Sequence, residues 1–345
     1  MNLPDASSGI SRKTVPAGAA KRKDLKLRVQ ELSGSSGHIA EYLVAEVLSR
    51  QHPEIVSYLL ETAILDRFCA PLCRQMHRIG SHGRTGKPEI GADPFIQWLV
   101  DANLFVIGLD GEGYWFRYHH LFQDLLQNEL RRRHGKDPCA ALHLRASEWF
   151  ESAGLVSEAI EHSLSAENLV RAAELVEQHS YDELAAERWN VVERWLDQLP
   201  PRIKAERPQL LLTEAWIANA RMQLNRVATL VEQTEALLRD EKATRTQLGE
   251  LAHFHGVLHY WAGEAEAAER LLSDAVSSME RDRPFFAFIA RLMLALARYM
   301  AGNKASALGV LRERLQAVEA QEPLVFRNPS VIEYAINLGG FCCNL

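Results

Sequence analysis

The stretch that decides the fold is residues 114–130, which reads Tyr-Trp-Phe-Arg-Tyr-His-His-Leu-Phe-Gln-Asp-Leu-Leu-Gln-Asn-Glu-Leu. Its first part alternates aromatic and polar side chains, as a half-buried strand does. After Tyr118 the period changes, because Leu121 with Leu125, and Phe122 with Leu126, are spaced four residues apart. That spacing places the four apolar side chains on one helix face. The stretch therefore predicts a strand that leads directly into an amphipathic helix.

A second strand is predicted just upstream of this stretch. Residues 104–109 are rich in β-prone side chains, and residues 110–113 read Asp-Gly-Glu-Gly. Glycines in such a position allow the positive φ that a hairpin turn requires. Together the two segments predict a β-hairpin that feeds a helix.

Short helices are expected before the hairpin. Residues 38–50 carry an apolar stripe and predict the first helix, and Pro53 stands where a second helix begins. Residues 70–77 are predicted to form a third short helix. Asp93-Pro94 opens a fourth helix, in which Phe95, Trp98 and Leu99 face the core. Residues 80–91 contain three glycines before Gly91 and read as a loop. Several small helices, a two-stranded wing and a closing helix predict a winged-helix-like domain over residues 37–137.

The first 36 residues differ in composition from the rest. They are poor in large apolar groups, and residues 12–28 hold seven basic residues and one acidic residue. Such a composition does not bury enough apolar surface to offset the entropy of the chain. We expect a disordered basic arm over residues 1–36. A basic arm can contact nucleic acid or lipid, although an unstructured leader is the simpler interpretation.

Beyond Asp137-Pro138 the chain shows only helical patterning, and the pattern repeats. An aromatic helix end, a glycine and a small-residue helix start recur around Gly154, Gly263 and Gly302, and the last two lie 39 residues apart (302 − 263). Residues 216–228 are a weaker copy with Gln223-Leu224-Asn225 in place of the glycine turn. Paired helices of this kind stack because one pair cannot bury its apolar face alone. The predicted fold is mainly α: the winged-helix-like unit, followed over residues 138–345 by an α-solenoid of tetratricopeptide-like helical hairpins.

Composition limits the classes of function. A formal net charge of −6 gives no general attraction to nucleic acid or acidic membranes, and no apolar run reaches the length of a membrane span. The N-terminus lacks the apolar core of a signal peptide, which predicts a cytoplasmic protein. Cys69, Cys73 and His77 share a helix, but without a second pair at suitable spacing we expect packing thiols and no metal.

No catalytic constellation stands out, and neither a cofactor nor a metal is expected. Residues 80–88 fail as a phosphate loop, because Ser81 and Pro88 occupy positions that require glycine and a hydroxyl residue. His119-His120 lies at a strand-to-helix junction, where a helix N-terminus favours an anion, although a structural or capping role competes. His253, His255 and His259 lie on neighbouring turns, and core or groove roles are the simpler interpretation. A group of charged residues is expected to be solvated or to line a groove: Glu183, Glu187, Arg188, Glu193 and Arg194.

At this point a resemblance is clear. Several segments, in the same order and spacing, are similar to the MalT-type large ATP-binding regulators of the LuxR family, and the match extends from about Leu32 to beyond Leu230. The segments that carry it are Tyr42–Leu48, Leu59–Cys73, Ala102–Phe105, Phe116–Leu126, Leu142–Phe150 and Gly154–Leu164.

The resemblance implies a signal-transduction ATPase architecture. Family members carry an N-terminal nucleotide-binding module, a winged helix, a superhelical tetratricopeptide-type sensor and a C-terminal helix-turn-helix. Inducer and ATP together drive self-association and transcription activation. In related ATPases a winged-helix histidine contacts the ADP phosphate, and the position that matches it here is His119.

This chain departs from the family because it has no Walker A or Walker B segment and no helix-turn-helix after its repeats. The repeat array looks cut off at its end. We therefore expect a non-enzymatic middle portion of a regulator, which binds a small-molecule inducer or a regulatory protein in its superhelix groove and self-associates. The alternatives are a winged helix that binds DNA with help from the basic arm, and a truncated product without independent activity. DNA binding is disfavoured, because Arg117 and residues 131–133 form the only dense basic cluster of the unit.

Overall fold

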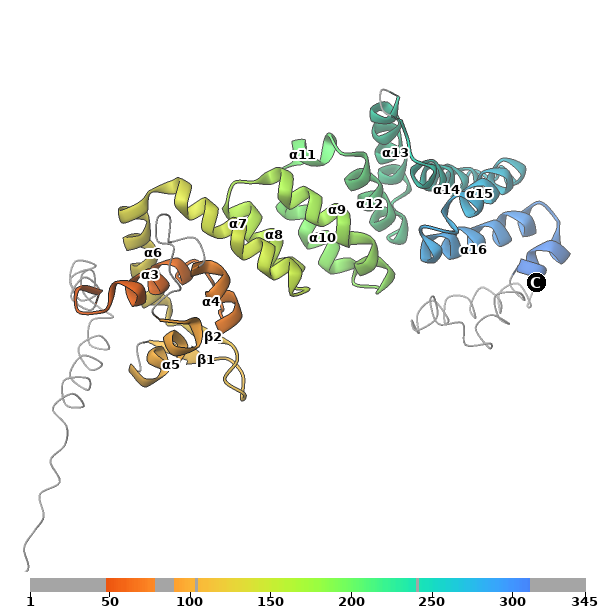
Figure 1. Cartoon of the computed structure of the whole chain (residues 1–345). Coiled ribbons are helices and arrows are strands. Elements are labelled where there is room, and N and C mark those ends of the chain that lie inside the picture. Colours follow the sequence, from red (N-terminus) through yellow and green to blue (C-terminus); the bar gives the residue numbers. More distant parts are fainter. Residues whose placement is uncertain (1–47, 78–89, 103–104, 240–241, 311–345) are drawn as a thin grey trace, which may run out of the picture. The chain divides into compact units, whose positions relative to one another are not determined.

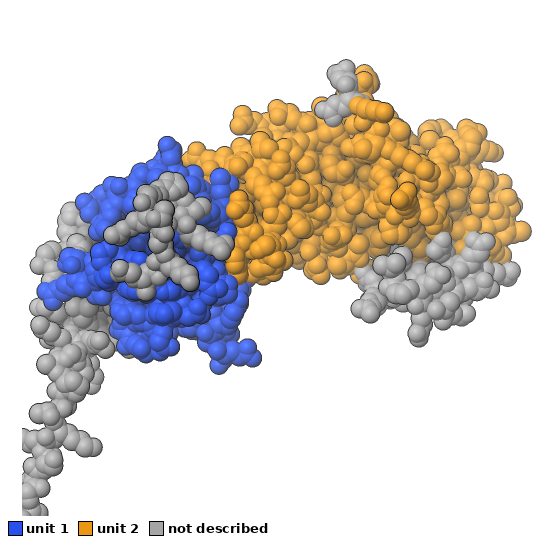
Figure 2. Space-filling view, in the orientation of Figure 1, with its two compact units in different colours: residues 1–146 blue, residues 147–345 orange. Residues whose placement is uncertain are grey.

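A computed structural model describes residues 48–77, 90–102, 105–239 and 242–310. The predicted basic arm, most of the helix predicted over residues 38–50, nearly all of the loop predicted over residues 80–91, and the last 35 residues lie outside these ranges. The chain divides into two compact units, residues 1–146 and residues 147–345, which Figure 2 shows in blue and orange. The fold is mainly α with one β-hairpin, as the sequence predicts.

The first unit consists of short helices around the hairpin (Figure 1). Pro53 begins its first described helix, and the helix predicted over residues 70–77 has those bounds. The described elements of this unit are α3 (Pro53–Thr62), α4 (Ala70–His77), α5 (Ala92–Ala102), β1 (Val106–Gly108), β2 (Phe116–Tyr118) and α6 (His120–His134).

The hairpin forms where the sequence places it. Strands β1 and β2 are antiparallel, with Val106 opposite Tyr118 and Gly108 opposite Phe116. The Asp110 carboxylate closes the turn by accepting hydrogen bonds from the amides of Tyr114 and Trp115, each at 2.8 Å. Desolvation alone would raise the pKa of Asp110, but these and other backbone hydrogen bonds together outweigh it, so the pKa of Asp110 is lowered. The wing is therefore held both by its strand pairing and by one side chain.

The inner side of β2 supplies the core of the unit. Phe116 and Tyr118 are buried and Arg117 between them is exposed, which is the period of a half-buried strand. The ring of Tyr118 packs on Phe68 with centroids 4.6 Å apart, and its hydroxyl lies 2.7 Å from the Thr62 hydroxyl. The closing helix is thus joined to a strand that is fixed against α3.

Helix α6 buries a different stripe from the predicted one. Phe122, Leu126 and Leu130 are buried, and Leu125 is half-buried. The expectation that Leu121 also faces the core is wrong, because its side chain is 41% exposed. Residues spaced four apart from Phe122 form one stripe, and Leu121 lies about 100° away from it.

The second unit continues from the middle of α7 as a succession of antiparallel helices (Figure 1). Neighbours along the chain pack together, notably α8 with α9, α12 with α13, and α14 with α15. The helices are α7 (Lys136–Ser152), α8 (Val156–Ser165), α9 (Leu169–Ala185), α10 (Trp189–Gln198), α11 (Pro201–Ala205), α12 (Pro208–Ala220), α13 (Leu224–Leu238), α14 (Arg245–Trp261), α15 (Ala265–Met279) and α16 (Pro284–Met300).

A single turn geometry joins most of these helices. In each case the residue after the C-cap is left-handed, with φ from +57° at Met222 to +85° at Gly302. At the predicted glycine turn, Gly263 donates to the Tyr260 carbonyl and Glu264 donates to the His259 carbonyl, which is the Schellman pattern. The left-handed residues of these turns are Gly154, Glu167, Glu187, Met222, Gly263 and Gly302. Helical hairpins therefore recur through the unit, including places where no glycine marks them.

Two glycines let α14 approach α15 closely. A Cβ atom on Gly256 would lie 2.6 Å from Leu272 Cγ, and one on Gly249 would lie 2.8 Å from Ser278 Cβ. Helix α14 also packs against α12, α13 and α16. None of the helices described has the length and apolar character needed to cross a membrane.

Candidate functional site

His119 is the N-cap of α6, immediately after the wing. Its amide donates to the Phe105 carbonyl at 2.6 Å, and its own carbonyl accepts from Phe122 and Gln123. Its side chain makes no capping hydrogen bond and lies beside His120, with ring centroids 4.3 Å apart. The side chain of His119 therefore does not cap α6. A half-buried imidazole at a helix N-terminus is suited to contact an anion.

The basic cluster of the first unit is partly neutralised. At the end of α6, Glu129 pairs with Arg132 at 2.7 Å and with Arg133 at 2.5 Å. These arginines lower the pKa of Glu129, with the hydrogen bond from Arg132 the largest cause. A carboxylate among the arginines weakens a continuous basic face of the kind that a DNA reader presents.

The residues considered as metal ligands do not assemble. Cys69 and Cys73 are buried free thiols, and burial raises the pKa of both. His77 instead stacks on Tyr58 and lies 2.9 Å from Glu61. Within the ranges that the structure describes, no group of three or more histidine, cysteine or acidic residues is placed to hold a metal ion.

Three histidines of α14 have three different surroundings. His255 pairs with Glu235 at 2.8 Å, and His259 pairs with Glu264 at 2.6 Å, both near the surface. His253 is fully buried and stacks on Trp216 with centroids 4.5 Å apart. Burial lowers the pKa of His253 from 6.5 to about 3, so its imidazole is neutral at physiological pH.

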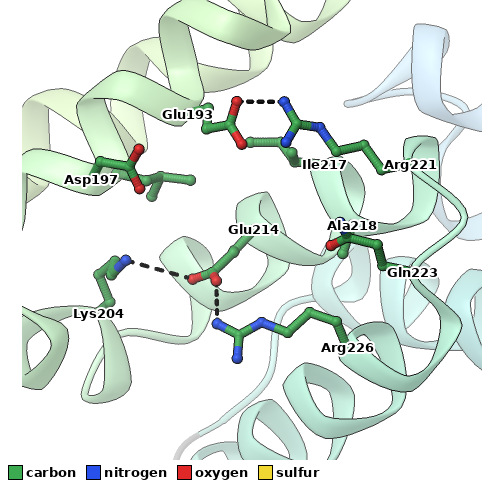
Figure 3. Close-up of a pocket in the computed structure, with 10 residues that line it drawn as sticks. Glu193, Asp197, Lys204, Glu214, Ile217, Ala218, Arg221, Gln223 and Arg226 are labelled. Carbon is green, nitrogen blue, oxygen red and sulfur yellow. Dashed lines mark hydrogen bonds and ion pairs between the residues drawn. The ribbon is translucent and has the colours of Figure 1, made fainter.

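A charged pocket opens between α10, α11, α12 and α13 (Figure 3). Its volume is about 90 Å³, enough for a few water molecules or one small functional group. Ion pairs cross it, since Arg221 pairs with Glu193, and Glu214 pairs with both Arg226 and Lys204. Asp197 also lines the pocket. Glu193 was expected to be solvated or to line a groove, and here it lines the pocket.

A buried polar cluster lies elsewhere in the second unit, and the sequence did not indicate it. Glu250 of α14 is fully buried, and its Oε1 accepts from the Tyr181 hydroxyl at 2.6 Å and from Trp216 Nε1 at 2.8 Å. Gln209 donates to the same Tyr181 hydroxyl at 2.7 Å. The guanidinium of Arg283 covers the Tyr181 ring, 3.7 Å from its centroid. One carboxyl group thus joins α9, α12 and α14.

Known proteins resemble this chain in both of its units. Residues 44–138 match the MalT winged helix domain. The HTH-type transcriptional regulator MalT of Serratia proteamaculans is 26% identical over 284 residues, which cover 82% of this chain and 30% of that regulator. The serine/threonine-protein kinase PknK of Mycobacterium tuberculosis is 30% identical over 255 residues, which cover 71% of this chain and 22% of the kinase.

A solved structure has a similar fold. It is the signal-transduction ATPase with numerous domains PH0952 from Pyrococcus horikoshii, which carries a tetratricopeptide repeat sensor. The TM-score is 0.56 at 13% identity, over 84% of this chain and 41% of that protein. The resemblance to MalT-type regulators is therefore confirmed, and this chain spans about a third or less of the curated relatives it matches.

Proposed function

We propose that this chain is the winged-helix and sensor portion of a MalT-like transcriptional regulator, and that it binds a ligand or partner without hydrolysing ATP. The observation that carries the proposal is a hairpin that feeds directly into α6 within the matched residues 44–138, followed by stacked helical pairs. The proposed limits of the two functional parts are residues 37–137 and 138–345. A cytoplasmic location and self-association belong to the same proposal.

The helical pairs are the proposed sensor. The pocket of Figure 3 supports this role, because its three basic side chains pair with Glu193 and Glu214, and Asp197 also lines the hollow. A ligand with hydrogen-bonding groups can replace one partner of such an ion pair at little cost in free energy, since ion pairs near the surface are weak. A small-molecule inducer or a regulatory protein in the groove of the repeats is the proposed partner.

His119 is the proposed contact to a nucleotide phosphate. Its place at the N-terminus of α6 supports this role, because amides at a helix start and the helix dipole both favour an anion. The histidine binds and orients in this proposal and carries no catalytic step. Its nucleotide would be supplied by a nucleotide-binding module of the kind that the resemblance implies.

Incubating the purified chain with ATP tests the non-enzymatic part of the proposal. We expect no release of phosphate above that of a buffer control, for the wild type and for His119→Ala alike. Turnover by the wild type that is lost in His119→Ala would contradict it, provided that both proteins give the same circular dichroism spectrum.

Binding to DNA is not part of the proposal, because Glu129 pairs with two of the arginines that would form the basic face. A gel shift with random duplex at about 50 mM salt, where phosphate contacts are strong, tests this. We expect no shift. A shift that weakens steeply with salt would instead favour the winged helix as a DNA reader.

A further inference from the structure

The buried polar cluster contains an unusual concentration of unpaired atoms. Among the described residues, five buried side-chain nitrogen or oxygen atoms have no hydrogen-bond partner, and four of these belong to Glu250, His253 and Arg283. The four atoms are Glu250 Oε2, His253 Nδ1 and Nε2, and Arg283 Nε. Buried polar groups are nearly always paired, so a cluster of exceptions in one place requires an explanation.

The two oxygens of Glu250 are in contrasting environments. Oε1 accepts two short hydrogen bonds, from Tyr181 and Trp216, whereas Oε2 has none. An ionised carboxylate in this position would carry part of its charge on a desolvated atom without a hydrogen-bond partner, which disfavours the ionised form. Burial accordingly raises the pKa of Glu250 above its ordinary 4.5, against the opposing effects of the two hydrogen bonds and of Arg283.

Arg283 is the cation that acts on Glu250. It is the N-cap of α16, and no ion pair joins it to Glu250, since its guanidinium lies on the Tyr181 ring. Its backbone amide donates to the Met279 carbonyl at 2.8 Å, which fixes the main chain at this residue. The side chain is not held by that hydrogen bond. The guanidinium therefore lies close to an ionisable carboxyl group to which it is not yet paired.

Among the residues that the structure describes, the other elements packed on α14 place no second cation that affects the pKa of Glu250. On α9 and α12 the facing groups are the Tyr181 hydroxyl, Trp216 and Gln209, and on α14 itself His253 is held neutral by burial. The α13 carboxylate of Glu235 is paired with His255. Helix α15 presents Leu272, Ala275, Ser278 and Met279 to the glycine side of α14.

We propose that Glu250 and Arg283 form a proton-linked latch between α9, α14 and α16. With a proton on Glu250 Oε2, Arg283 stays on the Tyr181 ring. When that proton leaves to solvent, Arg283 leaves the ring and pairs with the ionised carboxylate. No other bond forms or breaks, and the charge of the pair falls from +1 to 0.

The exchange has a structural consequence because Arg283 begins α16. A guanidinium on Tyr181 ties the start of α16 to α9, whereas a guanidinium on Glu250 ties it to α14. Protonation of the Glu250 carboxyl group thus determines whether the start of α16 contacts α9 or α14. Two discrete arrangements biased by a local charge are the usual basis of a switch.

Carbon-13 NMR of the whole chain labelled at glutamate tests the proposal, with the Arg283 Nε–Hε resonance followed in the same samples. The Glu250 side-chain carboxyl resonance is expected to titrate with a midpoint above 4.5, and the Arg283 resonance is expected to move with the same midpoint. The exposed Glu266 of α15 serves as the control carboxyl group.

Two variants separate the parts of the latch. In Glu250→Gln, which mimics the protonated state, the Arg283 resonance is expected to be independent of pH in this range. In Arg283→Gln the Glu250 midpoint is expected to rise, because its cation is gone. A wild-type Glu250 midpoint at or below 4.5, or an Arg283 resonance that ignores the Glu250 titration, would overturn the proposal. The wild-type titration decides even where a variant fails to fold.

Discussion

Replacing Met222 by glycine should make the second unit more stable, although the substitution removes the whole methionine side chain. Met222 occupies the left-handed position of the turn between α12 and α13, with φ of +57°, and its side chain is 56% exposed. An L-residue in this conformation costs about 1–2 kcal/mol, whereas glycine adopts it freely. Glycine also has more conformational freedom in the unfolded chain, which offsets about 0.5–1 kcal/mol.

The balance of these effects gives an expected gain of about 0.5–1 kcal/mol for Met222→Gly. Met222→Ala is the matched control, because it removes every side-chain atom beyond Cβ and keeps the strained backbone, so it should change the free energy of unfolding by less than about 0.5 kcal/mol. The reverse change, Gly263→Ala, should destabilise by about 1 kcal/mol. No atom lies within 4 Å of a Cβ at Gly263, so steric contact does not contribute.

Urea denaturation followed by circular dichroism measures these differences as shifts of the midpoint at constant m-value. The reasoning depends on a common turn geometry at positions with and without glycine. If Met222→Gly loses stability as an ordinary mid-helix glycine does, while Met222→Ala is neutral, the left-handed turn at this position is refuted.

Three further predictions concern packing and protonation. Gly256→Ala should destabilise by about 1–3 kcal/mol, because its Cβ would overlap Leu272, and calorimetry of the variant measures this. Leu126→Ala should lower the free energy of unfolding by about 2–5 kcal/mol in the urea denaturation assay, because Leu126 is buried. Leu121→Ala should lower it by less than about 0.5 kcal/mol, because Leu121 is exposed. Equal losses of stability in the two variants would contradict the observed burial of these two leucines. Because burial lowers the pKa of His253 from 6.5 to about 3, its contribution of about 4–5 kcal/mol is complete above pH 6.5 and is lost as the pH falls towards 3. His253→Phe should lack this component of acid unfolding in a pH series of unfolding free energies.

The wing and the glycine-marked turns could be predicted from the sequence because their signals are local. An alternating aromatic strand, an Asp-Gly turn and a change of period at Tyr118 lie within one short stretch, and Gly154, Gly263 and Gly302 take the left-handed conformation expected of them. The winged-helix-like unit and the stacked helical pairs followed from these features.

Other turns escaped because tertiary packing overrides residue preference. Glu187 adopts the same left-handed turn without a glycine, which no local rule predicts. Met222 also adopts it without a glycine, directly before Gln223-Leu224-Asn225, within the weaker copy of the pattern that the sequence indicates over residues 216–228. Their positions are nevertheless periodic, since Gly154 and Glu187 lie 33 residues apart (187 − 154) and Glu187 and Met222 lie 35 apart (222 − 187). These spacings are close to the tetratricopeptide period of about 34 and were the available signal.

The buried cluster could not be found from the sequence. Glu250 looks like an ordinary polar residue of a helix, and its two hydrogen-bond donors come from residues 69 and 34 positions away. Only the stacking of α9 and α12 against α14 brings them together. The pocket of Figure 3 depends in the same way on four helices, so among its charged residues the sequence indicates only Glu193, as part of a solvated face or a groove.

The claim that the helical pairs are the sensor is tested most directly by hydrogen exchange of the whole chain with a panel of small metabolites. A metabolite that raises the melting temperature should slow amide exchange in α10, α12 and α13 around the charged pocket, and Glu214→Gln should abolish this protection. Protection confined to residues 105–134 of the first unit, with the second unit unchanged, would contradict the account.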